Sequence, residues 1–467
     1  MSLNNLLRII ERLQFKNMLR NLTIHNFKSW QNTGQMPLAS LTGLFGNNSS
    51  GKTGIIQLLL MLKQTVESAD PQRVLHTGDE QTYIDLGTIY DVIYQHQIPG
   101  ELAFSLTWDL PEYLNIINPE GELDDIIFSI PSLSFNANIA VTAENLAVKS
   151  MTYSFDYENK NYLFGIEQQD NQNQSEYKLL SQGYTVKHFK GKAWPLPKPI
   201  KSYGFPNQIN SYYQNTAFLA DFVLAFEGLF QNIYYLGPLR DYPRRSYAWA
   251  GYQPQDVGKK GEQVIAALLA SRTRDKEEKI EQRVAEWLRQ LGLIYDFQLK
   301  PIAENRQEYE LRVRRTPTSS EVLITDVGFG VFQILPVLVL CYYAPKGSTL
   351  IFEQPEIHLH PSVQAGLADV FIDVIKTRNM QIIIETHSEH LLRRLQRRIA
   401  EAELQEKDAA LYFCQLNEQG NSQLIPLELD AYGNINNWPI GFFGDEMGEL
   451  LAMTEAAIKR QKGSQSQ

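Results

Sequence analysis

Eight consecutive residues near the N-terminus have the types and the spacing that bind phosphate. They fit the pattern G-x-x-x-x-G-K-[ST], the P-loop or Walker A motif, at every position: Gly46, Asn47, Asn48, Ser49, Ser50, Gly51, Lys52 and Thr53. The glycines let backbone N–H groups surround a phosphate at the start of a helix, Lys52 reaches the β- and γ-phosphate oxygens, and Thr53 presents a hydroxyl to Mg²⁺. An apolar strand is expected before the loop, at 41–45, and an apolar helix after it, at 55–62. These flanks favour a nucleoside triphosphate site over the alternative, a chance glycine turn before a helix.

A carboxylate ends a predicted apolar strand in the C-terminal part of the chain. The strand, 349–353, ends at Glu353, which is followed by Gln354 and, two residues later, by Glu356. A carboxylate at the end of a strand beside the P-loop is where the Mg²⁺ of a bound nucleotide needs a ligand. We therefore predict Thr53 and Glu353 as metal ligands.

Two further segments place polar groups at the ends of predicted elements. The apolar strand 381–385 delivers His387 at its tip. The segment from Asp326 to Gly330 opens an apolar helix, so the bare N–H groups of Gly328 and Gly330 could meet an anion.

The order of these motifs resembles that of the ABC-type ATPase heads of the RecF, SMC and OLD-nuclease group. Among them, it looks most like the AAA-family (OLD-like) ATPases that prokaryotes encode in DNA repair, mobile-element and phage-defence loci. The resemblance covers about residues 19 to 395 and also rests on short motifs at 235–240, 327–330, 386–392 and 437–443. It implies an ATPase that uses ATP and Mg²⁺.

The expected fold class is α/β: a P-loop NTPase with an ABC-ATPase-like head, in which a mostly parallel sheet forms the core beside an antiparallel β-rich N-terminal lobe and an inserted region. Short alternating runs between about 83 and 201 indicate the antiparallel part, and strands that alternate with helices from 321 onward indicate the parallel part. The expected domains are an N-terminal extension at 1–17, the P-loop lobe at 18–82, a β-rich insertion at 83–230, a connecting segment of helices and strands at 231–320, the C-terminal ATPase lobe at 321–425 and a C-terminal extension at 426–467.

The resemblance implies a mechanism in which two heads enclose two ATP molecules. Asp326, Gly328 and Gly330 of one subunit would cap the γ-phosphate held by Lys52 of the other, and His387 would sense that phosphate. ATP then favours the dimer because it contacts both chains, and hydrolysis removes the bridging phosphate.

Two weaker correspondences concern the N-terminal half. Lys28 and Ser29 resemble the basic turn that approaches the phosphates in these heads, so both join the predicted nucleotide-binding residues. A Q-loop glutamine is expected before the β-rich insertion, and Gln64 and Gln95 are alternatives for it.

Two positions depart from the family pattern. Where the family has Asp-Glu after the apolar strand, this sequence has Glu353 and Gln354. An amide can position water but cannot accept its proton, so we expect hydrolysis to be slowed by on the order of 10²-fold. Gln354, Glu356 and His387 are the predicted catalytic residues, with Glu356 as the substitute base. The signature serine of transporter-type ABC proteins is also absent from 326–330.

Composition and charge limit the partners. The chain has 467 residues, 43% apolar and 21% charged, which is typical of a folded soluble protein. Two cysteines cannot form a disulfide framework and no secretion signal is evident, so we expect a cytoplasmic protein. The longest apolar run, 334–343, is too short to cross a membrane. A net charge of −10 argues against a protein that coats nucleic acid non-specifically.

One lysine-rich segment has two interpretations. Five lysines between Lys187 and Lys201 are accompanied by Phe189, Trp194 and Tyr203. This composition is typical of a loop that binds a nucleic-acid strand, and equally of a solvated, proline-rich connector.

Two further groups also have alternative interpretations. Arg240, Arg244 and Arg245 could grip phosphate, DNA or a partner, or form solvated salt bridges. His358 and His360 are interpreted as a turn at the dimer interface rather than as a zinc site, because zinc needs three or four convergent ligands.

Two functions follow. The first is a nucleotide-driven dimerisation switch, at least dimeric when loaded with ATP, that regulates a separately encoded effector protein or a DNA transaction in phage defence or DNA repair. The second, motivated by Gln354, is an ATP sensor or assembly scaffold that hydrolyses little. We expect a homodimer or higher homo-oligomer, DNA contact only through a local basic patch, and no membrane partner.

Overall fold

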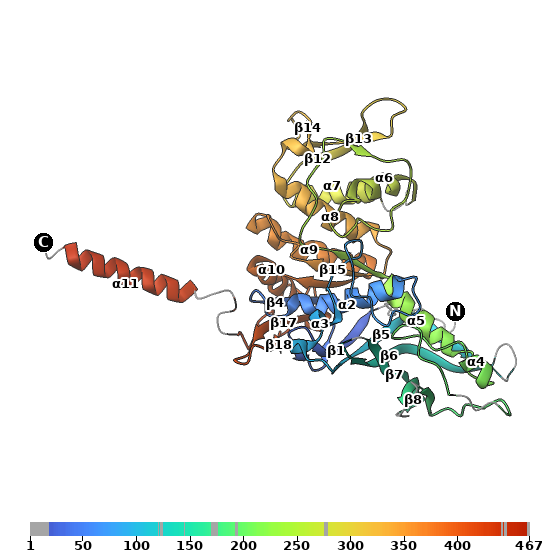
Figure 1. Cartoon of the computed structure of the whole chain (residues 1–467). Coiled ribbons are helices and arrows are strands. Elements are labelled where there is room, and N and C mark those ends of the chain that lie inside the picture. The colour runs from blue at the N-terminus through green and yellow to red at the C-terminus, as the bar shows by residue number, and fades with distance from the viewer. Residues whose placement is uncertain are drawn as a thin grey trace, which may run out of the picture.

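The computed structural model describes residues 18–119, 121, 125–143, 145–169, 176–191, 195–274, 279–439, 442 and 446–464. The predicted N-terminal extension, 1–17, lies outside these residues. Figure 1 shows an antiparallel sheet at the bottom, a second sheet with its helices in the middle, and an arm of helices and short strands at the top.

A six-stranded sheet forms the centre of the molecule. Its order is β10 (Ile233–Leu236), β15 (Thr349–Glu353), β16 (Gln381–Glu385), β4 (Leu41–Gly46), β17 (Ala409–Leu416) and β18 (Ser422–Pro426). Neighbouring strands are parallel except β17 and β18, so the predicted mostly parallel sheet is present. β15 and β16 are buried along their whole length, as is usual for parallel strands whose two faces are both covered.

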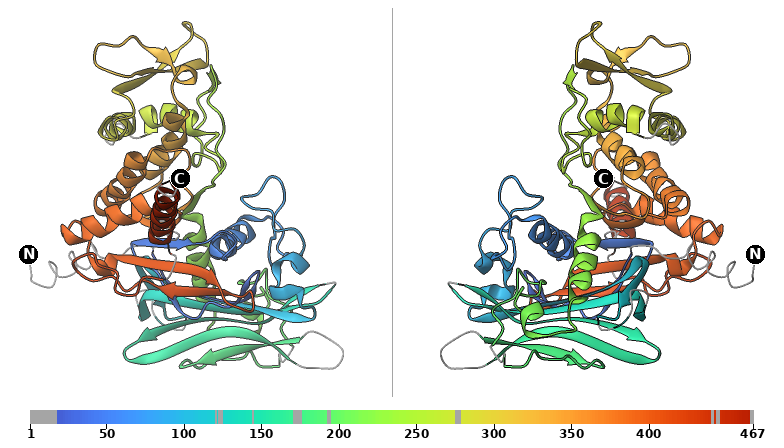
Figure 2. Two further views of the ribbon diagram at one scale, coloured as in Figure 1. Left: turned by 90° about the vertical axis from the view of Figure 1, so that its left-hand side faces the viewer. Right: turned by 90° about the vertical axis from the view of Figure 1, so that its right-hand side faces the viewer.

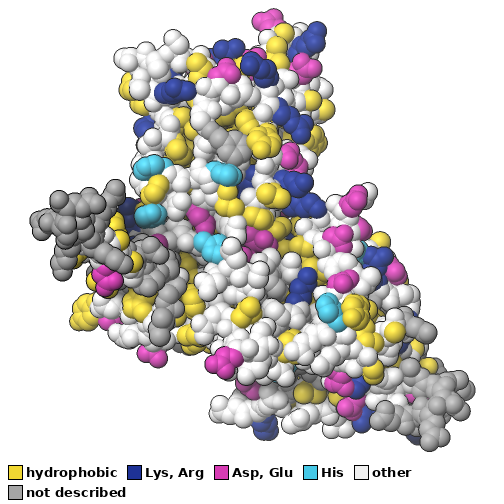
Figure 3. Space-filling view, turned by 60° about the vertical axis from the view of Figure 1, so that its left-hand side comes forward, with side chains coloured by type: hydrophobic (Ala, Val, Ile, Leu, Met, Phe, Trp, Pro, Cys, Tyr) yellow, Lys and Arg dark blue, Asp and Glu magenta, His cyan; other side chains and the backbone are white. Residues whose placement is uncertain are grey.

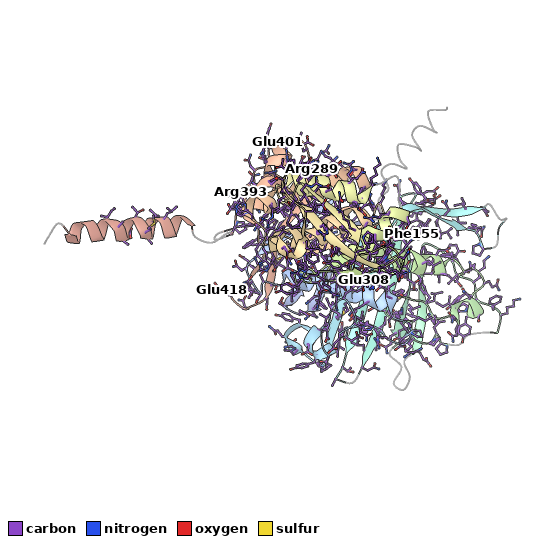
Figure 4. All side chains as sticks on the ribbon, turned by 90° about the horizontal axis from the view of Figure 1, so that it is seen from above. Phe155, Arg289, Glu308, Arg393, Glu401 and Glu418 are labelled. Atoms are coloured by element: carbon purple, nitrogen blue, oxygen red, sulfur yellow. The ribbon has the colours of Figure 1, made fainter. Side chains whose placement is uncertain are left out.

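Helices connect these strands and pack on them. They are α2 (Lys52–Glu67), α8 (Phe329–Tyr343), α9 (Pro361–Arg378) and α10 (Glu389–Ala400). Figure 4 shows Arg393 and Glu401 on the outside of the molecule, where Arg393 pairs with Glu389 and Glu401 pairs with Arg397. The opposite face of α10 buries leucines against α9, and Arg394 and Arg398 pair with Asp369 of α9 at its margin.

An eight-stranded antiparallel sheet occupies the bottom of Figure 1. Its order is β2 (Trp30–Asn32), β1 (Leu19–Phe27), β5 (Gly100–Ile117), β6 (Ile126–Val141), β7 (Leu146–Tyr157), β8 (Lys160–Gln169) and β9 (Glu176–Gln182), with β3 (Met36–Pro37) paired to β1. Alternate residues of β5 and β6 are buried because one face packs on α5 (Leu219–Gln231), where Phe135 and Tyr153 contact Phe226.

Two predicted domain boundaries pass through continuous sheets. β1 of the predicted P-loop lobe pairs with β5 of the predicted β-rich insertion. β10, from the predicted connecting segment, pairs with β15 of the central sheet. Neither pairing could be predicted from local sequence, because the hydrogen bonds join strands that lie far apart in the chain.

The arm contains α6 (Val264–Arg274), α7 (Ile280–Gln290) and a small sheet of β11 (Tyr247–Ala248), β13 (Glu308–Arg314), β12 (Asp296–Pro301) and β14 (Val322–Leu323). α6 and α7 both pack on α8, which is apolar on all sides and buried between the arm and the central sheet. The apolar run at 334–343 is therefore part of the core. Among the described residues, no helix is both long and apolar enough to cross a membrane.

Short elements complete the chain: α3 (Ile89–Val92), η1 (Tyr94–His96), α4 (Ile209–Tyr212), η2 (Ile324–Asp326) and η3 (Glu406–Asp408). The last helix, α11 (Glu446–Ser464), projects away from the rest of the molecule in Figure 1 and is seen end-on in Figure 2. Both cysteines are buried.

Candidate nucleotide-binding site

A cavity of about 490 Å³ surrounds the P-loop, where β4 and β16 end and α2 begins. Its walls come from the turn after β1, the P-loop and the loops after β15 and β16: Lys28, Ser29, Asn48, Ser49, Ser50, Gly51, Lys52, Thr53, Gly54, Gln354, Glu385 and His387. The structure thus brings together most of the predicted site residues from four separate parts of the sequence.

Two glycines give the P-loop its shape. Gly46 has φ +135°, and a Cβ there would lie 2.0 Å from the carbonyl oxygen of Cys414. Gly51 has φ +95°, and a Cβ there would lie 2.3 Å from Ser422 Oγ. A side chain at either position would therefore both strain the backbone and collide with the neighbouring strand or its end. The turn presents the open N-terminus of α2, with its free N–H groups, to the cavity.

Lys52 is folded into the P-loop. Its Nζ donates to the carbonyl oxygens of Gly46, at 2.9 Å, and Asn47, at 2.6 Å. Burial lowers the pKa of Lys52, while Glu385 and other acidic neighbours oppose this shift. The nearby Ser50 hydroxyl is buried without a hydrogen-bond partner. The Lys52 ammonium and the Ser50 hydroxyl are thus donors from which no carboxylate of the described residues accepts, beside the open N-terminus of α2. Such an arrangement fits the phosphates of a nucleotide.

The turn after β1 forms another wall, as predicted for Lys28 and Ser29. The Lys28 N–H donates to the carbonyl of Val92 at 2.7 Å, and Ser29 Oγ accepts from Ser422 Oγ at 2.7 Å. Burial lowers the pKa of Lys28. Both side chains line the cavity, and their binding role stays a prediction.

Glu385 is the site residue that sequence reasoning missed. Its Oε1 accepts a hydrogen bond from Thr53 Oγ1 at 3.0 Å. β16 lies between β4 and β15, so Glu353 ends a strand that is one removed from the P-loop strand, and its role as a metal ligand stays a prediction. Glu353 pairs in register with Glu385 one strand further out and accepts a hydrogen bond from the Tyr235 hydroxyl at 3.0 Å. Glu385 could have been found from the sequence because it ends a second predicted parallel strand, and the carboxyl ends of parallel strands meet at one edge of the sheet.

Burial and the adjacent Glu385 raise the pKa of Glu353 to about 7, and the bond from Tyr235 only partly offsets this. Because the folded-state pKa lies above the ordinary 4.5, folding favours the protonated form. This contribution to stability is complete below about pH 4.5 and is lost as the pH rises through about 7.

We therefore expect Glu353→Gln to unfold less readily than the parent above pH 7, by roughly 1–3 kcal/mol, and to match it near pH 4.5. Urea unfolding between pH 4.5 and 8, with EDTA and no nucleotide, measures the difference. Glu418→Gln, at an exposed position, is the control. Parallel stability curves for the parent and Glu353→Gln would contradict the expectation.

The three predicted catalytic residues lie on two adjoining loops. Gln354 has φ +45°, lines the cavity, and donates from its backbone N–H to the carbonyl of Glu385 at 2.7 Å. Glu356 is 6% exposed and its Oε1 accepts from the backbone N–H of His387 at 2.8 Å. Burial raises the pKa of Glu356 and lowers the pKa of His387, so His387 is neutral at pH 7.

The segment from Asp326 to Gly330 lies outside this cavity. Gly328 is the residue before α8, and a Cβ added there would meet no atom within 4 Å, while Asp326 lies 3.6 Å from Arg245. The Arg315 guanidinium donates to the Asp326 carbonyl at 3.2 Å. A single chain therefore does not bring this predicted element to its own P-loop.

The arginines that follow β10 differ in environment. Arg240 is 7% exposed and its Nη2 donates to the Gln354 carbonyl at 3.5 Å, whereas Arg244 and Arg245 are exposed. Burial lowers the pKa of Arg240 to about 10, with Glu356 opposing the shift.

Histidine side chains gather on the face shown in Figure 3. His358 lies in the turn before α9, and His360 caps that helix by accepting from the Ser362 N–H at 3.3 Å. Within the described ranges, no group of three or more His, Cys, Asp or Glu side chains is placed to hold a metal ion.

The lysine-rich segment is only partly a surface patch. Lys201 is buried and caps α2 by donating to the Val66 carbonyl at 2.8 Å, and Tyr203 is buried beside it. Both were predicted in a strand-binding loop or connector, and their burial corrects that grouping. Lys187 and Phe189 are exposed, and Trp194 lies outside the described residues.

The two Q-loop candidates are also separated. Gln64 is buried in α2 and donates to the His76 carbonyl at 2.6 Å, while Gln95 is exposed beside Tyr94. Neither lines the cavity.

Comparison with known proteins gives the broad class. Residues 252–392 match the family described as AAA ATPase domain. This part of the chain is similar to AAA ATPase domains. It includes Asp326–Gly330, Glu353 and His387, and it begins well after the P-loop. Residues 404–453 match a family described as protein of unknown function (DUF3696), and none of the curated proteins matches the sequence.

Solved SMC head structures resemble the chain at low identity. The SMC head domain from Thermotoga maritima is 12% identical, with 88% of this chain and 99% of that chain covered and a TM-score of 0.40. An SmcHead bound to the C-winged helix domain of ScpA is 10% identical, with 88% and 98% covered and a TM-score of 0.43.

Proposed function

We propose that this protein is an ABC-type ATPase that binds ATP with Mg²⁺ and uses the nucleotide as a dimerisation switch. The observation that carries the proposal is the cavity in which Lys52, Thr53 and Glu385 converge at the open N-terminus of α2. We further propose that the switch regulates a separately encoded effector or a DNA transaction in phage defence or DNA repair. The resemblance of the motifs supports this cellular context.

The residues around the cavity fit a triphosphate and its metal. Backbone N–H groups of 48–53 would hold the phosphates, and Lys52 would exchange its two carbonyl acceptors for phosphate oxygens. Thr53 and Glu385 would hold Mg²⁺, which supplies positive charge against the phosphates. Glu353 would support Glu385 from the next strand.

The hydrolytic role would fall to the loops after β15 and β16. The Gln354 amide, on the cavity wall, would orient a water molecule. Glu356 would accept its proton, because it lies two residues after Gln354 on the same loop and is held by the His387 backbone. His387 would contact the γ-phosphate as a neutral hydrogen-bonding group.

A second copy would complete the site. The exposed Gly328 and the start of α8 lie away from the cavity of their own chain, so their N–H groups are available to a nucleotide on another copy. For direct DNA contact we propose only the exposed lysines Lys187, Lys190 and Lys198.

The alternative is an ATP sensor or scaffold that hydrolyses little. Gln354 favours it, because an amide on the cavity wall cannot serve as the base. The two functions predict different responses to Gln354→Glu.

Light scattering after size exclusion, with ATP, with ADP and without nucleotide, tests the switch. We expect a dimer with ATP and Mg²⁺ and a monomer with ADP, because only the γ-phosphate would bridge two chains. A molecular mass that does not respond to ATP would refute the switch. A sensor predicts a large gain in turnover for Gln354→Glu, whereas ordinary parental turnover with no gain would exclude the sensor.

A further inference from the structure

Arg240 is a buried cation whose hydrogen-bonding capacity is largely unused. Its side chain is 7% exposed, and neither Nε nor Nη1 has a hydrogen-bond partner among the described residues. Within the part of the chain that the structure describes, its Nη2 donates to the Gln354 carbonyl over a long distance of 3.5 Å. A guanidinium in the interior is unfavourable unless it is paired, so this arrangement costs stability.

Two other arginines with little solvent exposure are held differently. Arg378 is also 7% exposed, but its Nη2 donates to the Ala344 carbonyl at 2.8 Å and its guanidinium lies 6.0 Å from the ring centre of Tyr342. The partly buried Arg398 pairs with Asp369 at 2.6 Å. Arg240 therefore lacks the close contacts by which a buried arginine usually stabilises a fold.

The Glu356 carboxylate near Arg240 also has unused hydrogen-bonding capacity. Glu356 is 6% exposed, and none of the residues that the structure describes hydrogen-bonds to its Oε2. Burial raises the pKa of Glu356, and hydrogen bonds from the His387 backbone and the Thr386 side chain, followed by the positive charge of Arg240, oppose this shift. The other charged or titratable groups around this carboxyl are Lys52, Glu385 and His387.

Arg240 also meets the backbone that shapes the cavity wall. The carbonyl of Gln354 accepts from Arg240, and the N–H of Gln354 donates to the Glu385 carbonyl at 2.7 Å. Gln354 has φ +45°, a conformation that non-glycine residues adopt at a cost, so its geometry depends on such contacts. The loop of Arg240 is itself fixed, because the N–H of Asp241 donates to the Lys260 carbonyl at 3.0 Å.

We propose that Arg240 is a positioning residue for ATP hydrolysis: its guanidinium fixes the Gln354 backbone at the cavity wall and holds a positive charge opposite Glu356. The inference rests on the proposed function and adds a residue to it. Arg240 acts through Gln354 and Glu356 and is retained for turnover at the expense of stability.

The test compares Arg240→Met with Arg240→Lys and with Arg378→Met, a control matched in burial. We expect Arg240→Met to lower the turnover rate by on the order of 10²-fold while the Kd of a fluorescent ATP analogue stays within about twofold of the parent's. Its melting temperature should equal or exceed the parent's, because an unpaired buried charge is removed. Arg240→Lys should recover part of the rate.

Arg378→Met should show the opposite pattern, with a lower melting temperature and parental turnover. A double variant, Arg240→Met with Glu356→Gln, should lose less turnover than the product of the two single losses, because part of the effect of Arg240 passes through that carboxylate.

Three results would overturn the inference. They are parental turnover in Arg240→Met, a melting temperature that falls as it does in Arg378→Met, and a parent that binds ATP without hydrolysing it. A parent that does not bind the ATP analogue would instead refute the proposed function, so the two failures are distinguishable.

Discussion

Replacing Lys52 with alanine is expected to weaken ATP binding by at least about 10²-fold and to abolish ATP-dependent dimerisation. The Lys52 ammonium is held inside the P-loop by the Gly46 and Asn47 carbonyls, at the start of the helix that faces the cavity. Each charge-assisted hydrogen bond to phosphate contributes about 1.5–3 kcal/mol, so losing one or two accounts for this magnitude. Calorimetric titration with ATP and light scattering measure the two effects.

Lys178→Ala provides the control for Lys52→Ala. Lys178 lies on the edge strand β9, is half exposed, and pairs with Glu167 at 2.9 Å. This variant should bind ATP and dimerise like the parent. If Lys52→Ala dimerised with ATP as readily as the parent, the proposed switch would be wrong.

Replacing Glu385 with glutamine is expected to lower the apparent affinity for Mg²⁺ in the presence of ATP by roughly 10–100-fold and to lower turnover with it. The reason is position, because the Glu385 carboxylate bonds directly to the Thr53 hydroxyl that the P-loop offers to a metal. Glutamine keeps the size of the side chain and removes the charge that a hard cation needs. Turnover measured against Mg²⁺ concentration at saturating ATP reports the change.

Glu353→Gln is the matched comparison for Glu385→Gln. Glu353 is one strand further from the P-loop strand, already bonded to Tyr235, and has a pKa of about 7, so neutralising it changes less charge. We expect its effect on Mg²⁺ dependence to be several-fold smaller. A larger effect in Glu353→Gln than in Glu385→Gln would restore the metal ligand predicted from sequence and refute the one inferred from the structure.

The residues proposed to hold the metal, Thr53 and Glu385, are distinct from Arg240, the residue proposed to position Gln354. Thr53 and Glu385 bond to each other at the P-loop, and the Gln354 backbone lies between Glu385 and Arg240, because its N–H donates to the Glu385 carbonyl and its carbonyl accepts from Arg240. Changes on the metal side should therefore affect binding and turnover together. Changes at Arg240 should affect turnover alone.

Local sequence determined the parts of this protein that depend on backbone conformation and near neighbours. The P-loop could be predicted because its glycine positions, its lysine and the following helix lie within a few residues of each other, and the same holds for the strands that end at Glu353 and Glu385. The alternation of strands and helices after 321 likewise predicts a parallel sheet, which the structure contains.

Only the tertiary structure decided which of these elements are neighbours. Strand order placed β16 between β4 and β15, so Glu385 rather than Glu353 meets Thr53. Burial separated Lys201 from the exposed lysines and left Arg240 unpaired beside Gln354. These outcomes depend on hydrogen bonds and packing between residues that are tens to hundreds of positions apart, which no local pattern encodes.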